Sequence, residues 1–192
     1  MHETDNTKDV LAEPESPPQD VIEGFRLSAQ QKEAWLRGGQ DELTLQAMFE
    51  VGGPLDARRL EGALGQVVDR HEILRTRFQR LPGMEIPIQV ISGAAACPFR
   101  FVEVGEDGAV FGPEEIERLR EEELRALGSE GEANVRCLLI RRLPLRHVLI
   151  LTVSALSADA RSLDNLLGEV VHFYGNGSGA AEDEPLQYVE FS

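Results

Sequence analysis

The segment that decides the fold is HVLILTVSALSADARSLDNLLGEVVHFY, which runs from His147 to Tyr174. Its start, Val148 to Val153, is an almost unbroken apolar run with the length of a buried strand. A short turn that holds Ser154 and Asp159 follows, and beyond it large apolar residues recur at helical spacing. Strand, turn and helix in this order place the turn at the edge of a sheet, where side chains that bind or catalyse are often held.

Length and composition indicate one globular unit. A chain of 192 residues, 42% of them hydrophobic and 28% charged, fits one domain or one lobe of a larger one. Its net charge of −15 argues against a nucleic-acid surface, since binding to phosphates needs clustered lysine and arginine. The same charge disfavours anionic membranes, and the longest apolar run, around 145–156, is too short to span a bilayer. We therefore expect no nucleic-acid partner and no membrane partner.

The usual signatures of a metal-binding, nucleotide-binding or secreted protein are missing from the sequence. The four histidines are scattered, and there is no glycine-rich phosphate loop and no His-Glu-x-x-His motif. We therefore predict no metal site and no cofactor site. Cys97 and Cys137 lack a paired spacing and stand in apolar surroundings, which indicates free, buried thiols. Together with the lack of a signal peptide, this predicts a cytoplasmic protein.

Residues 1–23 are acidic, contain several prolines and have almost no large apolar side chains. Such a segment buries too little surface to offset the entropy that ordering removes, so we expect a disordered acidic leader. The alternative is a tail that docks a partner protein, although the segment lacks the spacing of an amphipathic docking helix. The globular part is then 24–192.

The rest of the chain mixes helical and strand patterns. We expect helices at 28–36, 56–69, 113–127 and from 161, and strands at 43–51, 73–78, 86–91, 99–104, 135–142 and 148–153. Trp35 is the expected core anchor of the first helix. The alternation over 73–78 places Arg75 and Arg77 on the opposite side of a strand from its apolar residues.

One nonapeptide is specific enough to indicate a family. The segment from Arg70 to Phe78 reads RHEILRTRF and fits the pattern Arg-His-Glu-x-Leu-Arg-Thr-x-Phe at every defined position. On this motif the chain, from Phe25 to Ser192, resembles the N-terminal lobe of a condensation domain of a nonribosomal peptide synthetase.

Two weaker segments support the resemblance and complete the expected fold. The family's first motif is only partly matched here, in a worn first motif at Ser28, Gln31 and Trp35. Residues 188–191 resemble Tyr-x-Asp-Phe, with Glu190 in place of the aspartate. The resemblance implies a chloramphenicol-acetyltransferase-like α/β fold, an α+β two-layer sandwich with a mixed sheet and helices packed on one face. It also implies that 24–192 is a partial domain without its C-terminal lobe.

The turn differs from the family at the positions that carry its chemistry. The family has His-His-x-x-x-Asp-Gly there, and its second histidine is the base, or the positioning group, for attack of an amine on a thioester. The corresponding positions in this chain are Ser154, Ala155, Asp159 and Ala160. Ala155 has no proton-accepting atom, so we expect no catalytic residue in the turn.

The remaining motif residues are expected to serve the fold. The resemblance implies that Asp159 forms a buried ion pair with Arg75, which persists after the chemistry was lost. Structural roles are likewise expected for four further motif residues: Arg70, His71, Glu72 and Trp35.

The missing base indicates a role other than catalysis. We expect a non-catalytic, partial condensation-like domain of a nonribosomal peptide synthetase or hybrid assembly line, which acts in interdomain packing or in docking a partner. Adjacent adenylation or carrier domains are the expected partners, with phosphopantetheine attached only to carrier domains elsewhere. The alternative is a divergent acyltransferase, half of a condensation enzyme, that forms amide or ester bonds from carrier-bound thioesters with a base other than histidine. A third interpretation is a relic with no present role.

Overall fold

A computed structural model describes residues 24–38, 43–93, 97–103, 112–129, 134–176 and 187–188. The acidic leader expected at 1–23 lies outside the described residues. No helix in the described part of the chain is long and apolar enough to cross a membrane.

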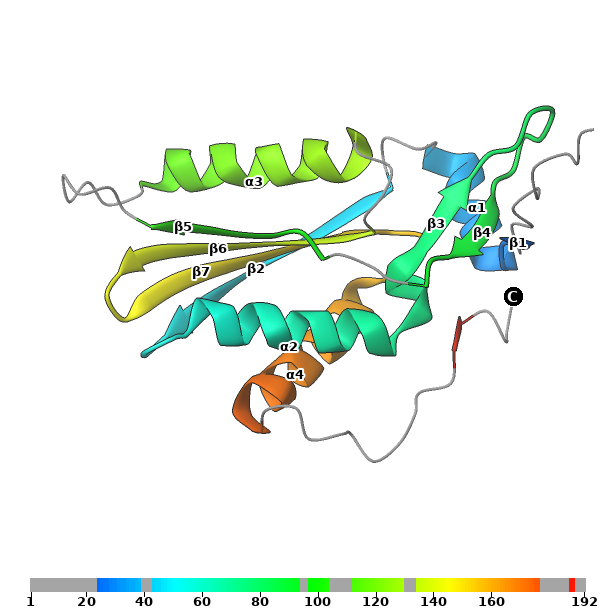
Figure 1. The fold of residues 1–192 in the computed structure, drawn as a ribbon. Coiled ribbons are helices and arrows are strands. Elements are labelled where there is room, and N and C mark those ends of the chain that lie inside the picture. The colour runs from blue at the N-terminus through cyan, green and yellow to red at the C-terminus, as the bar shows by residue number, and fades with distance from the viewer. Residues whose placement is uncertain are drawn as a thin grey trace, which may run out of the picture.

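A mixed four-stranded sheet forms the centre of the molecule (Figure 1). Its strands, in spatial order, are β2 (Thr44–Gly52), β7 (Arg146–Ser154), β6 (Val135–Leu143) and β5 (Phe99–Glu103). The first two neighbouring pairs are antiparallel, and β5 runs parallel to β6. The mixed sheet that the sequence predicts is therefore confirmed.

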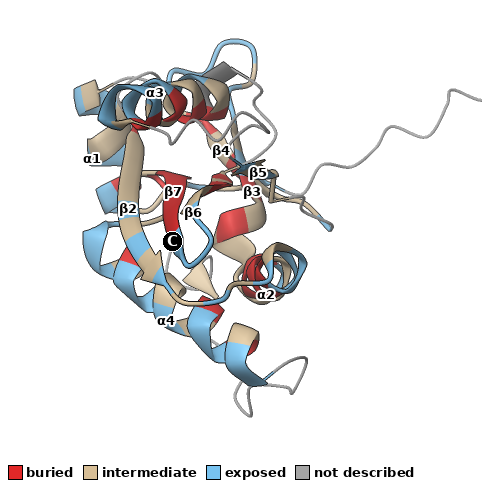
Figure 2. Ribbon diagram, turned by 90° about the vertical axis from the view of Figure 1, so that its left-hand side faces the viewer, coloured by how far each residue is buried: buried red, intermediate tan, exposed pale blue. Residues whose placement is uncertain are grey.

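Helices cover both faces of this sheet. The side chains of β6 and β7 point alternately to the two faces of the sheet. On one face they pack against α2 (Ala57–Arg70) and α4 (Ala160–Asn176). On the other face they pack against α3 (Pro113–Ser129). The first set is Val135, Cys137, Leu139, Leu149, Leu151 and Val153, and the second is Leu138, Ile140, Val148 and Ile150. Figure 2 shows the buried strand β7 between α3 on one side and α2 and α4 on the other.

The expected packing of helices on one face is therefore wrong. The central strands are apolar at successive positions, and a strand of that kind is stable only where both of its faces are covered. A two-layer sandwich would have left Leu138 and Ile150, which are 0% exposed here, in contact with water.

A smaller antiparallel sheet lies beside the main one, in the order β1 (Gly24–Phe25), β4 (Ile88–Ile91) and β3 (Thr76–Gln79). Between α2 and β3 the chain forms a single 3₁₀ turn, η1 (Glu72–Arg75). The strand expected over 73–78 is thus wrong in its first half. The hydroxyl of Thr76 donates to the carbonyl of Glu72 and closes this turn directly before β3.

The first helix, α1 (Ala29–Gly38), is anchored differently from the expectation. Gln31 is its buried residue, whereas Trp35 is only half-buried and donates its indole N–H to the carbonyl of Glu85 at 3.2 Å. Trp35 is thus a rim contact to the loop before β4. A polar residue occupies the position that faces the core.

The cysteines agree with the prediction of free thiols. Cys97 and Cys137 are both unpaired. Cys137 lies in the core with no exposed surface, whereas Cys97 is only half-buried, so the expected burial holds for Cys137 alone. Burial raises the pKa of the Cys97 thiol to about 12 and raises that of Cys137 well above its ordinary value. Both thiols are therefore protonated and unreactive at neutral pH.

The doubly covered sheet makes a stability prediction. Leu138→Ala should lower the free energy of unfolding by about 2–5 kcal/mol, because it leaves a cavity between β6 and α3. Val171→Ala on α4, where the side chain is 62% exposed, should change it by less than about 0.5 kcal/mol. Equilibrium denaturation measures both, and similar losses in the two variants would contradict the packing described.

Candidate functional site

The turn between β7 and α4 is held in a fixed shape by its own backbone. The N–H groups of Ser157 and Ala158 both donate to the carbonyl of Ser154, at 2.9 and 3.1 Å. The N–H of Ala155 donates to the carbonyl of Leu43, next to β2, at 2.9 Å. The turn is therefore anchored to the sheet edge, where the sequence places it.

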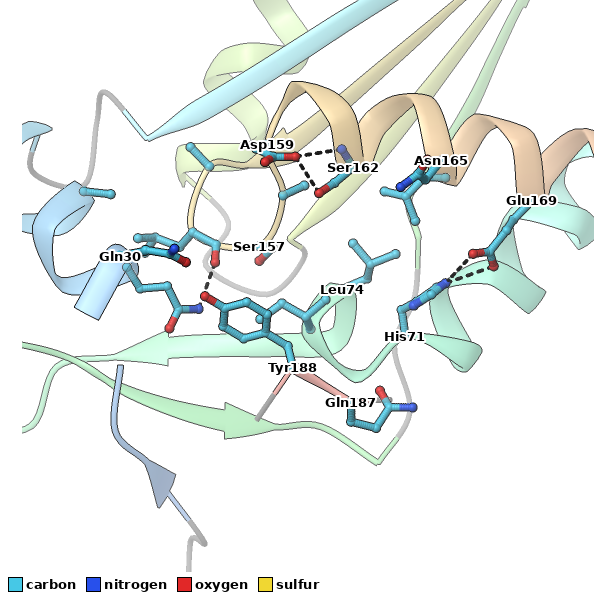
Figure 3. Close-up of a pocket in the computed structure, with 17 residues that line it drawn as sticks. Gln30, His71, Leu74, Ser157, Asp159, Ser162, Asn165, Glu169, Gln187 and Tyr188 are labelled. Atoms are coloured by element: carbon cyan, nitrogen blue, oxygen red, sulfur yellow. Dashed lines mark hydrogen bonds and ion pairs between the residues drawn. The ribbon is translucent and has the colours of Figure 1, made fainter. Parts of the chain in front are cut away.

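Asp159 caps the N-terminus of α4. Its Oδ1 accepts hydrogen bonds from the backbone N–H and the hydroxyl of Ser162, each at 2.7 Å (Figure 3). These two bonds, that from the hydroxyl first, lower the pKa of Asp159 below its ordinary value of 3.8. The carboxylate is exposed, so it serves as a helix cap at the surface.

The predicted ion pair between Asp159 and Arg75 is wrong. Arg75 donates to the carbonyl of Ser92 at 2.6 Å and forms an ion pair with Glu72 at 3.2 Å. Its guanidinium thereby joins η1 to the end of β4. Hydrogen bonds from Ser162 already stabilise the Asp159 carboxylate. The guanidinium of Arg75 contacts Ser92 and Glu72 instead.

Buried amide side chains connect α1 to the turn. The Nε2 of Gln31 donates to the carbonyl of Leu156 at 2.9 Å and to the Oε1 of Gln89 on β4 at 3.2 Å. The Oε1 of Gln31 accepts from the backbone N–H of Ser28, and Gln89 donates to the carbonyl of Arg26 at 2.7 Å. Gln31 therefore links α1, the small sheet and the turn through one side chain.

His71 belongs to a polar contact at the other end of the site. Its Nε2 lies 3.0 and 2.9 Å from the two carboxylate oxygens of Glu169 on α4 (Figure 3). Arg70 approaches the same carboxylate at 3.6 Å. These contacts tie the end of α2 to α4.

Gln187 and Tyr188 close the site from the far end of the chain. The Oε1 of Gln187 accepts from the N–H of Glu72 at 3.0 Å, and its Nε2 donates to the carbonyl of Arg70 at 3.2 Å. The hydroxyl of Tyr188 lies 2.8 Å from that of Ser28. Gln187 thus bridges the break between α2 and η1.

These elements enclose a pocket of about 560 Å³. Its walls come from α1, the end of α2 with η1, the turn, α4 and the Gln187–Tyr188 segment (Figure 3). The polar groups that line it include His71, Ser157, Asp159, Asn165 and Glu169. A volume of this size fits a small ligand.

The part of the pocket wall formed by Ala155 and Ser157 offers no strong base. Ala155 lines the pocket with a methyl group, and the buried hydroxyl of Ser157 has no hydrogen-bond partner among the described residues. Among the described residues that line the pocket, His71 supplies the imidazole, and Glu169 occupies its Nε2. In the described part of the chain no group of three or more histidine, cysteine, aspartate or glutamate side chains has the arrangement of a metal site.

Sequence reasoning located the turn, with Ala155 in it, but not the rest of the pocket. Glu169 lies within a helix and carries no local signal that it faces His71. Gln31 had a signal, because it is one of the matching positions of the worn first motif. Gln187 adjoins the closing segment at 188–191, but the hydrogen bonds by which it bridges α2 and η1 are tertiary contacts with no local sequence signal.

The mixed sheet between helices, with a pocket at the turn after β7, defines a chloramphenicol-acetyltransferase-like α/β unit. Within that class, the condensation domain profile matches residues 25–192. The chain therefore belongs to the condensation domain family.

Known relatives are peptide synthetases and related enzymes that are much longer than this chain. Cyclosporin synthetase of Tolypocladium inflatum is 29% identical over a match that covers 79% of this chain and 1% of that protein. Chondramide synthase of Chondromyces crocatus is 31% identical, with coverage of 86% and 4%. The chain thus spans only a few per cent of these relatives.

Solved structures show the same relationship. The X-domain in its complex with OxyB from teicoplanin biosynthesis is 29% identical, with a TM-score of 0.67, and the match covers 88% of this chain and 37% of that chain. The starter condensation domain of rhizomide synthetase, in a double mutant bound to C8-CoA, gives a TM-score of 0.71 at 17% identity, which shows the shared fold alone.

The capping geometry makes a prediction about Asp159. Asp159→Ala should lower the free energy of unfolding by about 0.5–2 kcal/mol, the usual loss for a helix cap. Asp159→Asn keeps an acceptor oxygen and should lose less. Equilibrium denaturation measures both, and a loss of more than about 3 kcal/mol for Asp159→Ala would instead indicate a buried ion pair.

The same cap predicts a pH dependence. Because the folded-state pKa is lowered, the ionised carboxylate stabilises the fold at pH values above 3.8, and this contribution is lost as the pH falls through the lowered pKa. The difference in free energy of unfolding between the native chain and Asp159→Asn should therefore shrink as the pH falls below 3.8. A difference that stays constant down to acidic pH would contradict the assignment.

Proposed function

We propose that this chain is a non-catalytic condensation-type segment of a nonribosomal peptide synthetase or hybrid assembly line, and that it acts by packing against or docking other protein domains. The carrying observation is the methyl group of Ala155 at the wall of the pocket. The motif resemblance assigns this position to the family's catalytic histidine, and an alanine neither accepts nor donates a proton.

The neighbouring hydroxyl groups do not replace that base. The Oγ of Ser154 accepts a hydrogen bond from the N–H of Leu156 at 3.3 Å, and the Oγ of Ser157 is buried with no partner in the described part of the chain. A serine nucleophile needs a base within hydrogen-bond reach, and in the described structure neither serine contacts an imidazole or an amine. Asp159 is engaged as a helix cap.

The docking role draws support from the comparison with the X-domain. That protein is 29% identical to this chain and was solved as a complex with OxyB, a separate protein. A condensation-type fold is thus compatible with binding a protein partner. Adenylation domains, carrier domains and tailoring enzymes of the same assembly line are the partners we propose here.

The second candidate is a divergent acyltransferase that uses a base outside the turn. The observation that favours it is His71, which lines the pocket and has its Nε2 fixed by Glu169. A carboxylate that fixes one nitrogen of an imidazole leaves the other free to accept a proton. Its acyl donors would be carrier-bound thioesters.

An assay of amide and ester formation tests both candidates. The natural protein that contains this chain is given carrier-loaded donors, and its products are measured by mass spectrometry. We expect no bond formation that depends on this segment, so Ser154→Ala and His71→Gln should leave product levels unchanged. A drop of tenfold or more in His71→Gln, with an unchanged melting temperature, would establish the acyltransferase instead.

Deletion of 24–192 from the natural protein is the complementary test. The docking function requires that this deletion impair folding of the remainder, adenylation, or the binding of a partner domain. If all three are unchanged, the segment is a relic and the proposed function is wrong.

A further inference from the structure

The hairpin between β6 and β7 ends in an exposed apolar tip. Leu143 is 46% exposed and Leu145 is 57% exposed, with Pro144 between them. The tip is stiff, because proline fixes the backbone of the turn and the N–H of Gly53 donates to the carbonyl of Leu145 at 2.9 Å. It lies at the start of β7, whereas the turn that lines the pocket described above follows the end of β7 (Figure 1).

Basic side chains surround this tip in an otherwise acidic chain. The segment 141–147 reads RRLPLRH and contains three arginines and no acidic residue, whereas the whole chain carries 34 acidic and 19 basic residues. Arg141 is already engaged, since it forms an ion pair with Glu103 and lies over the ring of Phe101. Within the described residues, Arg142 and Arg146 form no such ion pair.

Arg142 carries an unsatisfied buried donor. Its Nε–H is buried and finds no acceptor among the described residues. A buried donor without an acceptor costs about 1–3 kcal/mol and calls for a physical explanation. An acceptor that arrives from outside the chain supplies one.

A pocket of about 400 Å³ lies beneath the tip, and Arg142, Leu143 and Arg146 line it. Glu50 lines it as well and partly offsets the two guanidinium groups. His147, also at the pocket, adds no charge at neutral pH, because burial and then Arg141 lower its pKa. The pocket is therefore cationic enough for one added carboxylate, with a guanidinium to bind it in bidentate geometry.

The surroundings favour a carboxylate on a protein over a free anion. Glu50 weakens the attraction for a small anion that gains only a charge contact. A protein segment gains two contacts at once, because its apolar side chains bury Leu143 and Leu145 while its carboxylate enters the pocket.

We propose that the β6–β7 hairpin is a docking surface for an acidic, partly apolar segment of another protein domain. The partner's carboxylate binds Arg142 and Arg146, and its apolar side chains pack on Leu143 and Leu145. This inference rests on the proposed docking function and names the surface that performs it.

Photo-crosslinking in the natural protein, with its assembly-line partners present, tests this surface. A photoreactive amino acid replaces Leu145 in one variant and Leu143 in a second, and the matched control carries it at Val171, an exposed position on α4. We expect crosslinks from the hairpin, and not from Val171, to one peptide that combines aspartate or glutamate with apolar residues. Mass spectrometry identifies the peptide.

Charge reversal tests the electrostatic part. The double variant Arg142→Glu and Arg146→Glu should reduce the crosslink at least tenfold, and reversal of the acidic residues in the partner peptide should restore it. Arg37→Glu, at an exposed arginine on α1, is the matched control and should leave it unchanged. An unchanged melting temperature shows that each variant remains folded.

Three results would overturn the inference. The first is a hairpin crosslink no stronger than the crosslink at Val171. The second is a hairpin crosslink that forms only to residues 1–23 or to another copy of this chain. The third is a crosslink that the Arg142→Glu and Arg146→Glu double variant leaves unchanged. If deletion of 24–192 still impaired partner binding, the docking function would stand and its surface would lie elsewhere. If that deletion had no effect, the proposed function itself would fail.

Discussion

The burial of β6 and β7 on both faces is the constraint on which the rest of the structure depends. Apolar residues at successive positions need cover on each side, so α3 packs on one face while α2 and α4 pack on the other. With the sheet held between helices, the ends of β7 become the accessible features. One end leads into the turn and its pocket, and the other into the hairpin tip.

The motif residues around the pocket make contacts that stabilise the fold. Asp159 caps α4, Gln31 binds the carbonyl of Leu156, and His71 with Arg70 ties α2 to α4 through Glu169. Each contact stabilises the packing of elements around the pocket. Folding therefore accounts for these side chains, whether or not the pocket carries out a reaction.

The sequence was sufficient for features that depend on local patterns. Hydrophobic periodicity located the helices and most strands, and Asp56 caps α2 as its position before the helix suggests. The nonapeptide at 70–78 indicated the family. What the sequence did not show depends on distant contacts: the placement of α3 across the sheet, the 3₁₀ turn inside 73–78, and the partners of Arg75 and Asp159. The ion pair failed as a prediction because each charge had a nearer partner.

The contact between Ser28 and Tyr188 has a consequence for the order of folding during synthesis. It joins residues 160 positions apart, and Gln187 reaches back to Glu72 across 115 positions. Contacts of such sequence separation form late, because the entropy of closing the intervening loop is lost before any contact is gained. A nascent chain can thus assemble the central sheet first, while the wall formed by Gln187 and Tyr188 is added only after residues 187 and 188 have left the ribosome.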